Sequence, residues 1–392
     1  MVFDDIPRVD ATPSGHNEGR FAFLNRSASV YFGLVRSLIE EWFTHIPAAD
    51  QKDLRGALRA NNRQSESAFW ELYLHEAYRR SGYDIEIHPE VSGSTTRPDF
   101  RVTSGPDSWY LEAVSVGRPP EAIAQDQRLN DVYSILTALQ VVNFRIEVST
   151  YSIGPNAPAT KRLLSELRSW LGGLDPDVVG AAAEESTEVG FDRLPELAWE
   201  DAGWSLVFHA LPLSEGARDR PGPALVAMGP GEAVIVDNVS GIRRVLKEKH
   251  GKYGRLESPL IVAVQSNTLY PTKDYEVEQA LYGLAVRRPL ESAKHPSDIF
   301  QDGFWLSSGG WRNGDTPQVI TVHGLSPWTV TRTQPRCWQT LEPNTITPKQ
   351  PGWLAPMLVG AESLPGPASP LATHFGLDAD WPGMEDPDFA VV

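Results

Sequence analysis

The chain has 392 residues, of which 41% are hydrophobic and 22% are charged, an ordinary composition for a globular protein. Its 51 acidic and 35 basic residues give a formal net charge of −16, which argues against a protein that coats nucleic acid by bulk electrostatic attraction. Cys337 is the only cysteine, so internal disulfides and zinc sites of the C-x-x-C type are excluded.

The N-terminal residues lack the basic start and the continuous apolar stretch of a secretory signal. Nowhere does the chain reach the roughly 18 consecutive apolar residues that a membrane span requires. We therefore expect a cytoplasmic protein that does not bind membranes.

The first elements are helices. Aromatic and aliphatic residues recur at three- and four-residue steps over residues 21–63, which predicts an N-terminal helical region over residues 1–64. A further helix begins near Ser65 and ends at Ser81 and Gly82, after two arginines, which is a typical C-terminal signal.

Three strands follow this helix. Residues 83–87 alternate with period two, and short strands are expected at 98–102 and 109–116, separated by turns rich in Gly, Ser and Pro. A helix over about 120–141 and a strand at 144–148 would complete an αβββαβ unit, so residues 65–150 are predicted to form the α/β core.

The rest of the chain is less regularly patterned. Residues 151–345 are predicted to form an α/β extension packed on or beside the core, with a buried strand at 259–264, where the residues are all apolar. From Gln350 onward there are seven prolines, six acidic residues and no Lys or Arg. This composition predicts a Pro-rich acidic tail over residues 346–392 that wraps the body or is partly free.

Two carboxylates stand out in the predicted core. Asp99 follows Pro98 at the start of one strand, and Glu112 lies in the middle of the next, with Leu111 and Ala113 on the opposite face. Antiparallel pairing of these strands would bring the two acids side by side. Two carboxylates, a backbone carbonyl and waters suit Mg²⁺, which would polarise a phosphate and lower the pKa of an attacking water.

The order of these elements resembles the core of the PD-(D/E)XK nuclease-like (restriction endonuclease-like) superfamily. The resemblance covers about residues 66–150 and is carried by Glu71 on the helix, Gly82 at its end, the segments 97–100 and 110–113, and the spacing between them. It implies an αβββαβ fold, Asp99 and Glu112 as metal ligands, Glu71 as a further ligand bound directly or through water, and Mg²⁺ (or Mn²⁺) as the cofactor. The segments 252–254, 259–264 and 280–283 are similar to those that follow this core in an actinobacterial-type branch.

The sequence departs from the superfamily pattern at one position. The lysine of the superfamily pattern would fall two residues after Glu112, where this chain has Val114. A valine can neither orient water nor stabilise developing phosphate charge. A substitute could come from Gln125 or Gln127 on the following helix, or from Lys249 and Lys252 in the distant segment.

The helical acid has two candidates. Glu71 shares a helical stripe with Leu74 and Tyr78, which turns it toward the sheet. Glu66 lies on the stripe of Phe69 and Tyr73 and is a rival, but its distance from Gly82 fits the superfamily less well.

Several further residues have two interpretations. His75 and His88 could carry protons, although structural or surface roles are the simpler reading. The basic residues at 243, 244, 247, 249 and 252 could contact phosphates or could form a solvated helix face.

The sequence therefore predicts a Mg²⁺-dependent endonuclease that cleaves the phosphodiester bonds of nucleic acid, in the first place DNA, in a restriction or phage-defence role. Its catalytic residues would be Glu71, Asp99 and Glu112, and homo-oligomers or protein partners remain open. The alternative is a catalytically inactive protein of this fold that acts as a nucleic-acid-binding or protein-interaction scaffold, which Val114 and the acidic surface favour. A third hypothesis makes the residues beyond 150 a separate domain that selects the target.

Overall fold

The computed structural model confirms the predicted α/β class and divides the chain into two compact units. Unit 1 contains Met1–Pro13, Gly19–Arg118 and Val236–Val391, and unit 2 contains Ser14–Glu18, Pro119–Ile235 and Val392. The residues that the structure describes are 1–117, 120–184, 194–228, 237–268, 271–283, 302–307, 309–357, 367 and 369–384.

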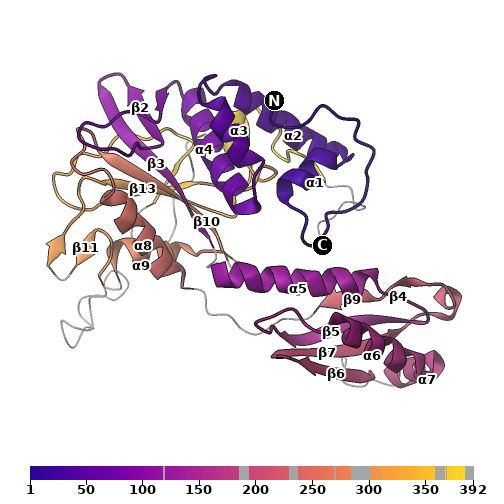
Figure 1. Ribbon diagram of the computed structural model, residues 1–392. Coiled ribbons are helices and arrows are strands. Elements are labelled where there is room, and N and C mark those ends of the chain that lie inside the picture. The colour runs from indigo at the N-terminus through magenta and orange to yellow at the C-terminus, as the bar shows by residue number, and fades with distance from the viewer. Residues whose placement is uncertain are drawn as a thin grey trace. The chain divides into compact units, whose positions relative to one another are not determined.

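Unit 1 is built around a mixed seven-stranded sheet (Figure 1). The strand order is β1 (Asp84–Ile87), β2 (Phe100–Ser104), β3 (Asp107–Gly117), β10 (Leu260–Asn267), β13 (Gln318–His323), β14 (Arg336–Gln339) and β15 (Ala355–Pro356). The first three strands are antiparallel neighbours, whereas β3, β10 and β13 run parallel. The strand β10 lies in the middle of the sheet, which explains its apolar sequence, because helices cover both of its faces.

Helices cover the two faces of this sheet (Figure 1). On one face, α4 (Asn62–Arg80) packs with α1 (Arg20–Arg26), α2 (Val30–Thr44) and the short α10 (Leu371–Phe375) into one hydrophobic core that includes Leu111 of β3. On the other face, α8 (Asn238–His250) and α9 (Asp274–Tyr282) form a second core with Tyr110 and Val116 of β3. Since neighbouring strand residues point to opposite faces, Glu112 lies on the α8 face.

The N-terminal segment and the described part of the C-terminal segment both belong to unit 1. The predicted N-terminal helical region shares its hydrophobic core with α4 and the sheet, and α3 (Gln51–Leu58) lies against α4. The described part of the Pro-rich tail contributes the buried residues Trp353, Leu371 and Trp381 to the same core, so this part wraps the body. A small ribbon of β11 (Leu306–Ser307) and β12 (Gly310–Trp311) completes the described elements of unit 1.

Unit 2 has a sheet and a core of its own. Its four-stranded sheet has the order β6 (Glu196–Asp201), β7 (Trp204–Pro212), β5 (Phe144–Ser152) and β9 (Leu225–Met228). Apolar residues of these strands form one core with helices α5 (Pro120–Ala138), α6 (Thr160–Gly172) and α7 (Pro176–Glu184). A two-stranded ribbon of β4 (Gln140–Val141) and β8 (Gly222–Pro223) and the short 3₁₀ helix η1 (Glu215–Ala217) complete its described elements.

The position of unit 2 in the chain corrects the predicted core of residues 65–150. The helix at 120–141 and the strand at 144–148 do form, as α5 and β5, but β5 pairs with β7 and β9 in the sheet of unit 2. The elements that follow β3 within its own sheet are α8 and β10, which pairs parallel to β3. The strand pattern of residues 144–148 predicted a buried strand correctly, but a local pattern does not specify the partner strand.

Among the described helices, none combines the length and the apolar character that crossing a bilayer would require.

Candidate functional site

The candidate site is centred on Asp99 and Glu112 at the junction of β2 and β3. Phe100 is paired with Leu111, so the register places Asp99 opposite Glu112 just beyond the last pair of the ladder. Residues directly opposite each other in an antiparallel pair share a face of the sheet. The backbone N–H of Ala113 donates to Asp99 Oδ2 at 2.7 Å and fixes that carboxylate against β3. The predicted side-by-side arrangement of the two acids is therefore present.

The Glu112 carboxylate is almost completely buried and is surrounded by donors. Its side chain is 1% exposed, and its Oε1 accepts from Lys249 Nζ at 2.6 Å and from Lys252 Nζ at 3.1 Å. The Tyr253 hydroxyl donates to Oε2 of the same carboxylate. A buried carboxylate requires such partners, because leaving its charge unpaired in the interior costs several kcal/mol.

The local sequence explains why these donors reach Glu112. In α8, Ile242, Val245 and Leu246 are buried against the sheet, and Lys249 continues this stripe at a spacing of three to four residues. The helix ends at His250, and Tyr253, in the following turn, is buried in the same core as β3. Lys249 and Lys252 are therefore brought to β3 by packing, although they lie more than 130 residues away in the sequence.

Glu71 approaches the same acids from the other side of the sheet. It lies on α4, which covers the face opposite to α8, yet its charge interacts with that of Glu112. The pKa of Glu71 is raised to about 7, mainly by burial and to a lesser extent by repulsion from Glu112. The charge of Lys249 acts in the opposite direction.

The same effects act on Asp99. Burial raises its pKa well above the ordinary value, and the charges of Glu112 and Glu71 raise it further. The hydrogen bond from Ala113 and the charge of Lys249 oppose these effects without cancelling them. For Lys249, burial lowers the pKa, but the hydrogen bond and the charge of Glu112 outweigh it, so the pKa is raised. The site therefore holds three acids in mutual repulsion against two ammonium groups.

The donor set is chemically suited to a divalent cation. Mg²⁺ prefers carboxylate oxygens, uses one or two of them, and retains much of its water, and the repulsion between these acids is what a cation would relieve. Within the described ranges, however, no three His, Cys, Asp or Glu side chains are gathered closely enough to hold an ion. Glu71 comes from the helix on the opposite face, so Asp99 and Glu112 are the two carboxylates that could share one ion.

Of the four residues considered as substitutes for the missing lysine, two reach the acids and two belong to the other unit. Lys249 and Lys252 both contact Glu112, whereas Gln125 and Gln127 belong to α5 in unit 2. Val114 points to the same face as Glu112 and packs against the core beneath α8. The chain therefore supplies ammonium groups to the acids from α8 and from the turn that follows it.

The rival helical acid, Glu66, does not join the site. Its carboxylate pairs with Arg20 at 2.9 Å and accepts from Asn267 Nδ2 at 2.9 Å. These contacts assign Glu66 a structural role and leave Glu71 as the helical acid that interacts with Asp99 and Glu112.

The two histidines near the core differ in exposure. His75 is buried, and burial lowers its pKa to about 4, so it is neutral at physiological pH. His88 is exposed, and its backbone N–H donates to the Asp99 carbonyl oxygen at 2.9 Å. Its backbone adopts a φ of 49°, and this hydrogen bond joins the end of β1 to the residue that begins the acid pair.

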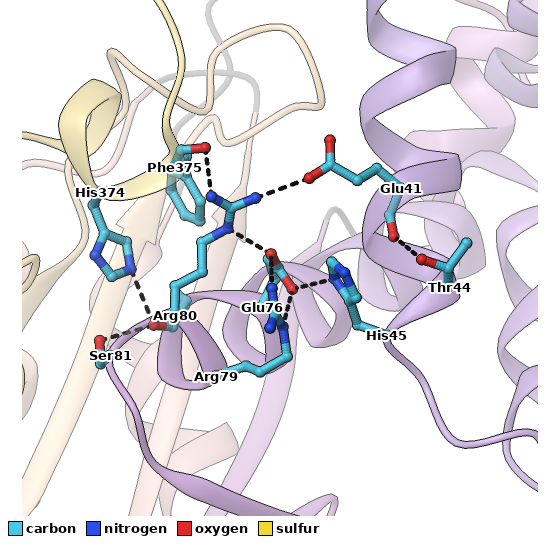
Figure 2. A network of polar contacts seen from close by, with 10 residues as sticks. Glu41, Thr44, His45, Glu76, Arg79, Arg80, Ser81, His374 and Phe375 are labelled. Atoms are coloured by element: carbon cyan, nitrogen blue, oxygen red, sulfur yellow. Dashed lines mark hydrogen bonds and ion pairs between the residues drawn. The ribbon is translucent and has the colours of Figure 1, made fainter.

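Sequence reasoning missed another buried carboxylate, Glu76, which Figure 2 shows at the centre of a polar network. Glu76 is 0% exposed and is bonded by Arg79 Nε at 2.8 Å, Arg80 Nε at 2.5 Å and His45 Nδ1 at 2.9 Å. Arg80 also donates to Glu41 on α2 and to the Phe375 carbonyl on α10. The network joins α2, α4 and the C-terminal segment. The i+3 and i+4 spacing of the two arginines was the signal that could have revealed it.

Comparisons of the chain with protein-family models, curated proteins and solved structures found no match.

Proposed function

We propose that this chain is a Mg²⁺-dependent nuclease that cleaves phosphodiester bonds, in the first place those of DNA, and that it resembles the PD-(D/E)XK superfamily. The observation that carries the proposal is the contact of Lys249 with Glu112 beside Asp99. Two acids for a cation and one ammonium group for the developing phosphate charge are the groups that such hydrolysis requires.

The order of elements in unit 1 supports this likeness. The succession α4, β1, β2, β3, α8 and β10 has the order αβββαβ, with β10 parallel to β3. In this reading unit 2 is an insertion between the third strand and the second helix of the core. A restriction or defence role, with unit 2 selecting the target, is compatible with this organisation.

Each side chain has a definite role in the proposed reaction. Asp99 and Glu112 would hold Mg²⁺. Glu71 would orient a water molecule bound to that ion. The bound ion supplies Lewis-acid polarisation of the phosphate and a water of lowered pKa. Lys249, once drawn from Glu112 toward the substrate, would donate to a non-bridging phosphate oxygen, and Tyr253 would keep Glu112 in its orientation.

The surroundings of Lys249 provide a place for the phosphate backbone. Exposed cations Arg244, Lys247, Lys252 and Arg255 lie along α8 and the turn that follows it. Among the described residues, no acidic side chain lies within ion-pair distance of Arg244 or Lys247. Phosphate contacts draw on such clusters of Lys and Arg, even in a chain whose net charge is negative.

The test is cleavage of plasmid DNA by the purified protein with Mg²⁺ or Mn²⁺. We expect nicking that is abolished by Asp99→Ala and by Glu112→Ala, with Glu66→Ala as the matched control because Glu66 is paired elsewhere. Circular dichroism verifies that each variant is folded. Cleavage that survives both substitutions at the acid pair would reject the assignment.

The second candidate is an inactive member of this fold that binds nucleic acid or protein. It is favoured by the saturation of Glu112, whose two oxygens are already engaged by Lys249, Lys252 and Tyr253. Calorimetry distinguishes the two functions. Saturable binding of Mn²⁺ that is lost in Asp99→Asn supports the nuclease, and the absence of divalent-ion binding supports the scaffold.

A further inference from the structure

The oxygens of Glu112 are already engaged by neighbouring donors. Lys249 Nζ and Lys252 Nζ both contact Oε1, at 2.6 and 3.1 Å, and the Tyr253 hydroxyl donates to Oε2. A carboxylate offers about four lone-pair positions, so these contacts use most of them. A divalent cation beside Glu112 would also be repelled by the charges of two ammonium groups. Cation binding at Glu112 is therefore opposed by its lysines, and it becomes favourable when one of them leaves.

The two lysines are held to different degrees. Lys249 lies in the last turn of α8 and its side chain is 16% exposed. Its charge also acts on Asp99 and on Glu71. Lys252 follows the end of the helix, its side chain is 32% exposed, and its contact with Glu112 is the longer of the two. Because a lysine stem is flexible and its ammonium group is readily hydrated, Lys252 is the cation that can leave Glu112 at the lower cost.

A phosphodiester would give Lys252 a second partner. Arg244, Lys247 and Arg255 are exposed on α8 and on the turn that follows it, and they mark the proposed path of the nucleic-acid backbone. Ammonium groups form strong, charge-assisted hydrogen bonds with phosphate oxygens. When a phosphate lies on this path, Lys252 can exchange Glu112 for the phosphate without leaving its own charge unpaired.

We propose that Lys252 couples substrate binding to cation binding: in the free protein its ammonium group stays on Glu112 and opposes the cation, and a phosphodiester draws it away and opens the acid pair to Mg²⁺. This inference rests on the proposed function, since it takes Asp99 and Glu112 as the ligands of the ion. Lys252 keeps its proton throughout, and only its partner changes. Thermodynamic reciprocity requires that nucleic acid and cation each raise the affinity for the other by the same factor.

The experiment measures Ca²⁺ binding to the full-length protein by calorimetry, with and without a saturating duplex oligonucleotide, because Ca²⁺ takes oxygen ligands as Mg²⁺ does. We expect the oligonucleotide to raise the Ca²⁺ affinity of the unaltered chain about tenfold, within the usual range of coupling between two sites. Lys252→Met removes the competing charge, so it should bind Ca²⁺ about tenfold more tightly without the oligonucleotide and gain less than about twofold from it. Binding that is lost in Asp99→Asn is assigned to the acid pair.

Two further variants separate this coupling from simple contact with phosphate. Lys247→Met also removes an exposed cation of α8, and it should weaken DNA binding while leaving the Ca²⁺ affinity of the free protein unchanged. Lys252→Arg keeps the positive charge and should retain the coupling. A lysine that only contacted phosphate would weaken DNA binding when substituted but would not raise the Ca²⁺ affinity of the free protein.

The outcomes separate this inference from the nuclease assignment. An unchanged Ca²⁺ affinity in free Lys252→Met, or an equal affinity of the unaltered chain with and without the oligonucleotide, overturns the role of Lys252. If Lys252→Met fails to fold, the comparison within the unaltered chain decides. Coupled binding in a protein that never cleaves plasmid DNA supports this role and rejects the nuclease, whereas cleavage without coupling does the reverse.

Discussion

Two glutamates of unit 1 are almost equally buried, yet their surroundings differ in charge balance. Around Glu76, the guanidinium groups of Arg79 and Arg80 face two carboxylates, those of Glu76 and Glu41. Although burial raises the pKa of Glu76, the hydrogen bonds from Arg79 and Arg80 outweigh it and lower the pKa below its ordinary value. This carboxylate is ionised and satisfied, and it stabilises the fold.

Around Glu112, three carboxylates face two ammonium groups. Lys249 and Lys252 contact Glu112, while Asp99 and Glu71 keep raised pKa values because burial and their acidic neighbours outweigh the cations. The difference teaches that burial alone does not identify a functional carboxylate. An unbalanced acidic group is costly to the fold, and such groups concentrate at functional sites.

The largest expected effect on stability is at Glu76, whose charge is balanced by Arg79 and Arg80. Glu76→Gln should lower the free energy of unfolding by about 3 kcal/mol, because it leaves two guanidinium groups without their buried carboxylate. Urea denaturation at pH 7 measures the loss. Glu41→Gln, which changes an exposed partner of Arg80, should cost less than about 1 kcal/mol. Equal losses in the two variants would contradict the distinction.

The sign of the pH dependence at Glu76 follows from its lowered pKa. Its carboxylate contributes stability that is fully present above the unfolded value of 4.5 and is lost as the pH falls through the lower folded value. The stability difference between Glu76→Gln and the unaltered chain should therefore shrink in acid below that value.

The next effect concerns the rate of DNA cleavage at the group of Asp99, Glu112 and Glu71, where the carboxylates outnumber the ammonium groups. Lys249→Met should reduce DNA cleavage by about 100-fold, which corresponds to the loss of one donor to developing phosphate charge. Lys247→Met, two residues earlier and exposed, should leave the cleavage rate of bound DNA unchanged. Single-turnover kinetics at saturating DNA make the comparison, and an unchanged rate in Lys249→Met would remove this lysine from the reaction.

Glu71→Gln should increase the stability of the protein, in contrast to Glu76→Gln, and the change is expected to be smaller. Its pKa is raised from 4.5 to about 7, so the folded state binds its proton more tightly and loses stability as the pH rises between these values. Glu71→Gln should therefore stabilise the metal-free protein by about 2 kcal/mol at pH 8 and have little effect at pH 4.5. Thermal unfolding in EDTA at the two pH values tests this, and destabilisation at pH 8 would contradict it.

The smallest effect is expected on the basic surface. Arg244→Ala should weaken DNA binding about threefold and reduce the slope of log K against log salt by about 1, as for one lost phosphate contact. Lys161→Ala, an exposed cation of unit 2, is the control. A salt slope that is unchanged in Arg244→Ala would remove this residue from the phosphate path.

Much of the site could be predicted from local sequence. Patterns within about 50 residues predict the helix that contains Glu71, the strand that follows Asp99 and the strand that contains Glu112. The same patterns favour Glu71 over Glu66 as the helical acid. The insertion could not be predicted, because residues 120–148 form a helix and a strand of the expected kinds but pair in another sheet. Helix propensity and strand alternation are local, whereas strand partners are chosen by packing over the whole unit.

The sequence by itself determined the α/β class, the main elements around the acids, and Lys249 and Lys252 as candidates to replace the missing lysine. Only the tertiary structure decided that both lysines reach Glu112, that Tyr253 joins them, and that Glu76 is held by arginines instead. The physical reason is that the charge state of a buried carboxylate depends on every group around it, and residues far apart in the chain become neighbours only when the sheet and its helices assemble.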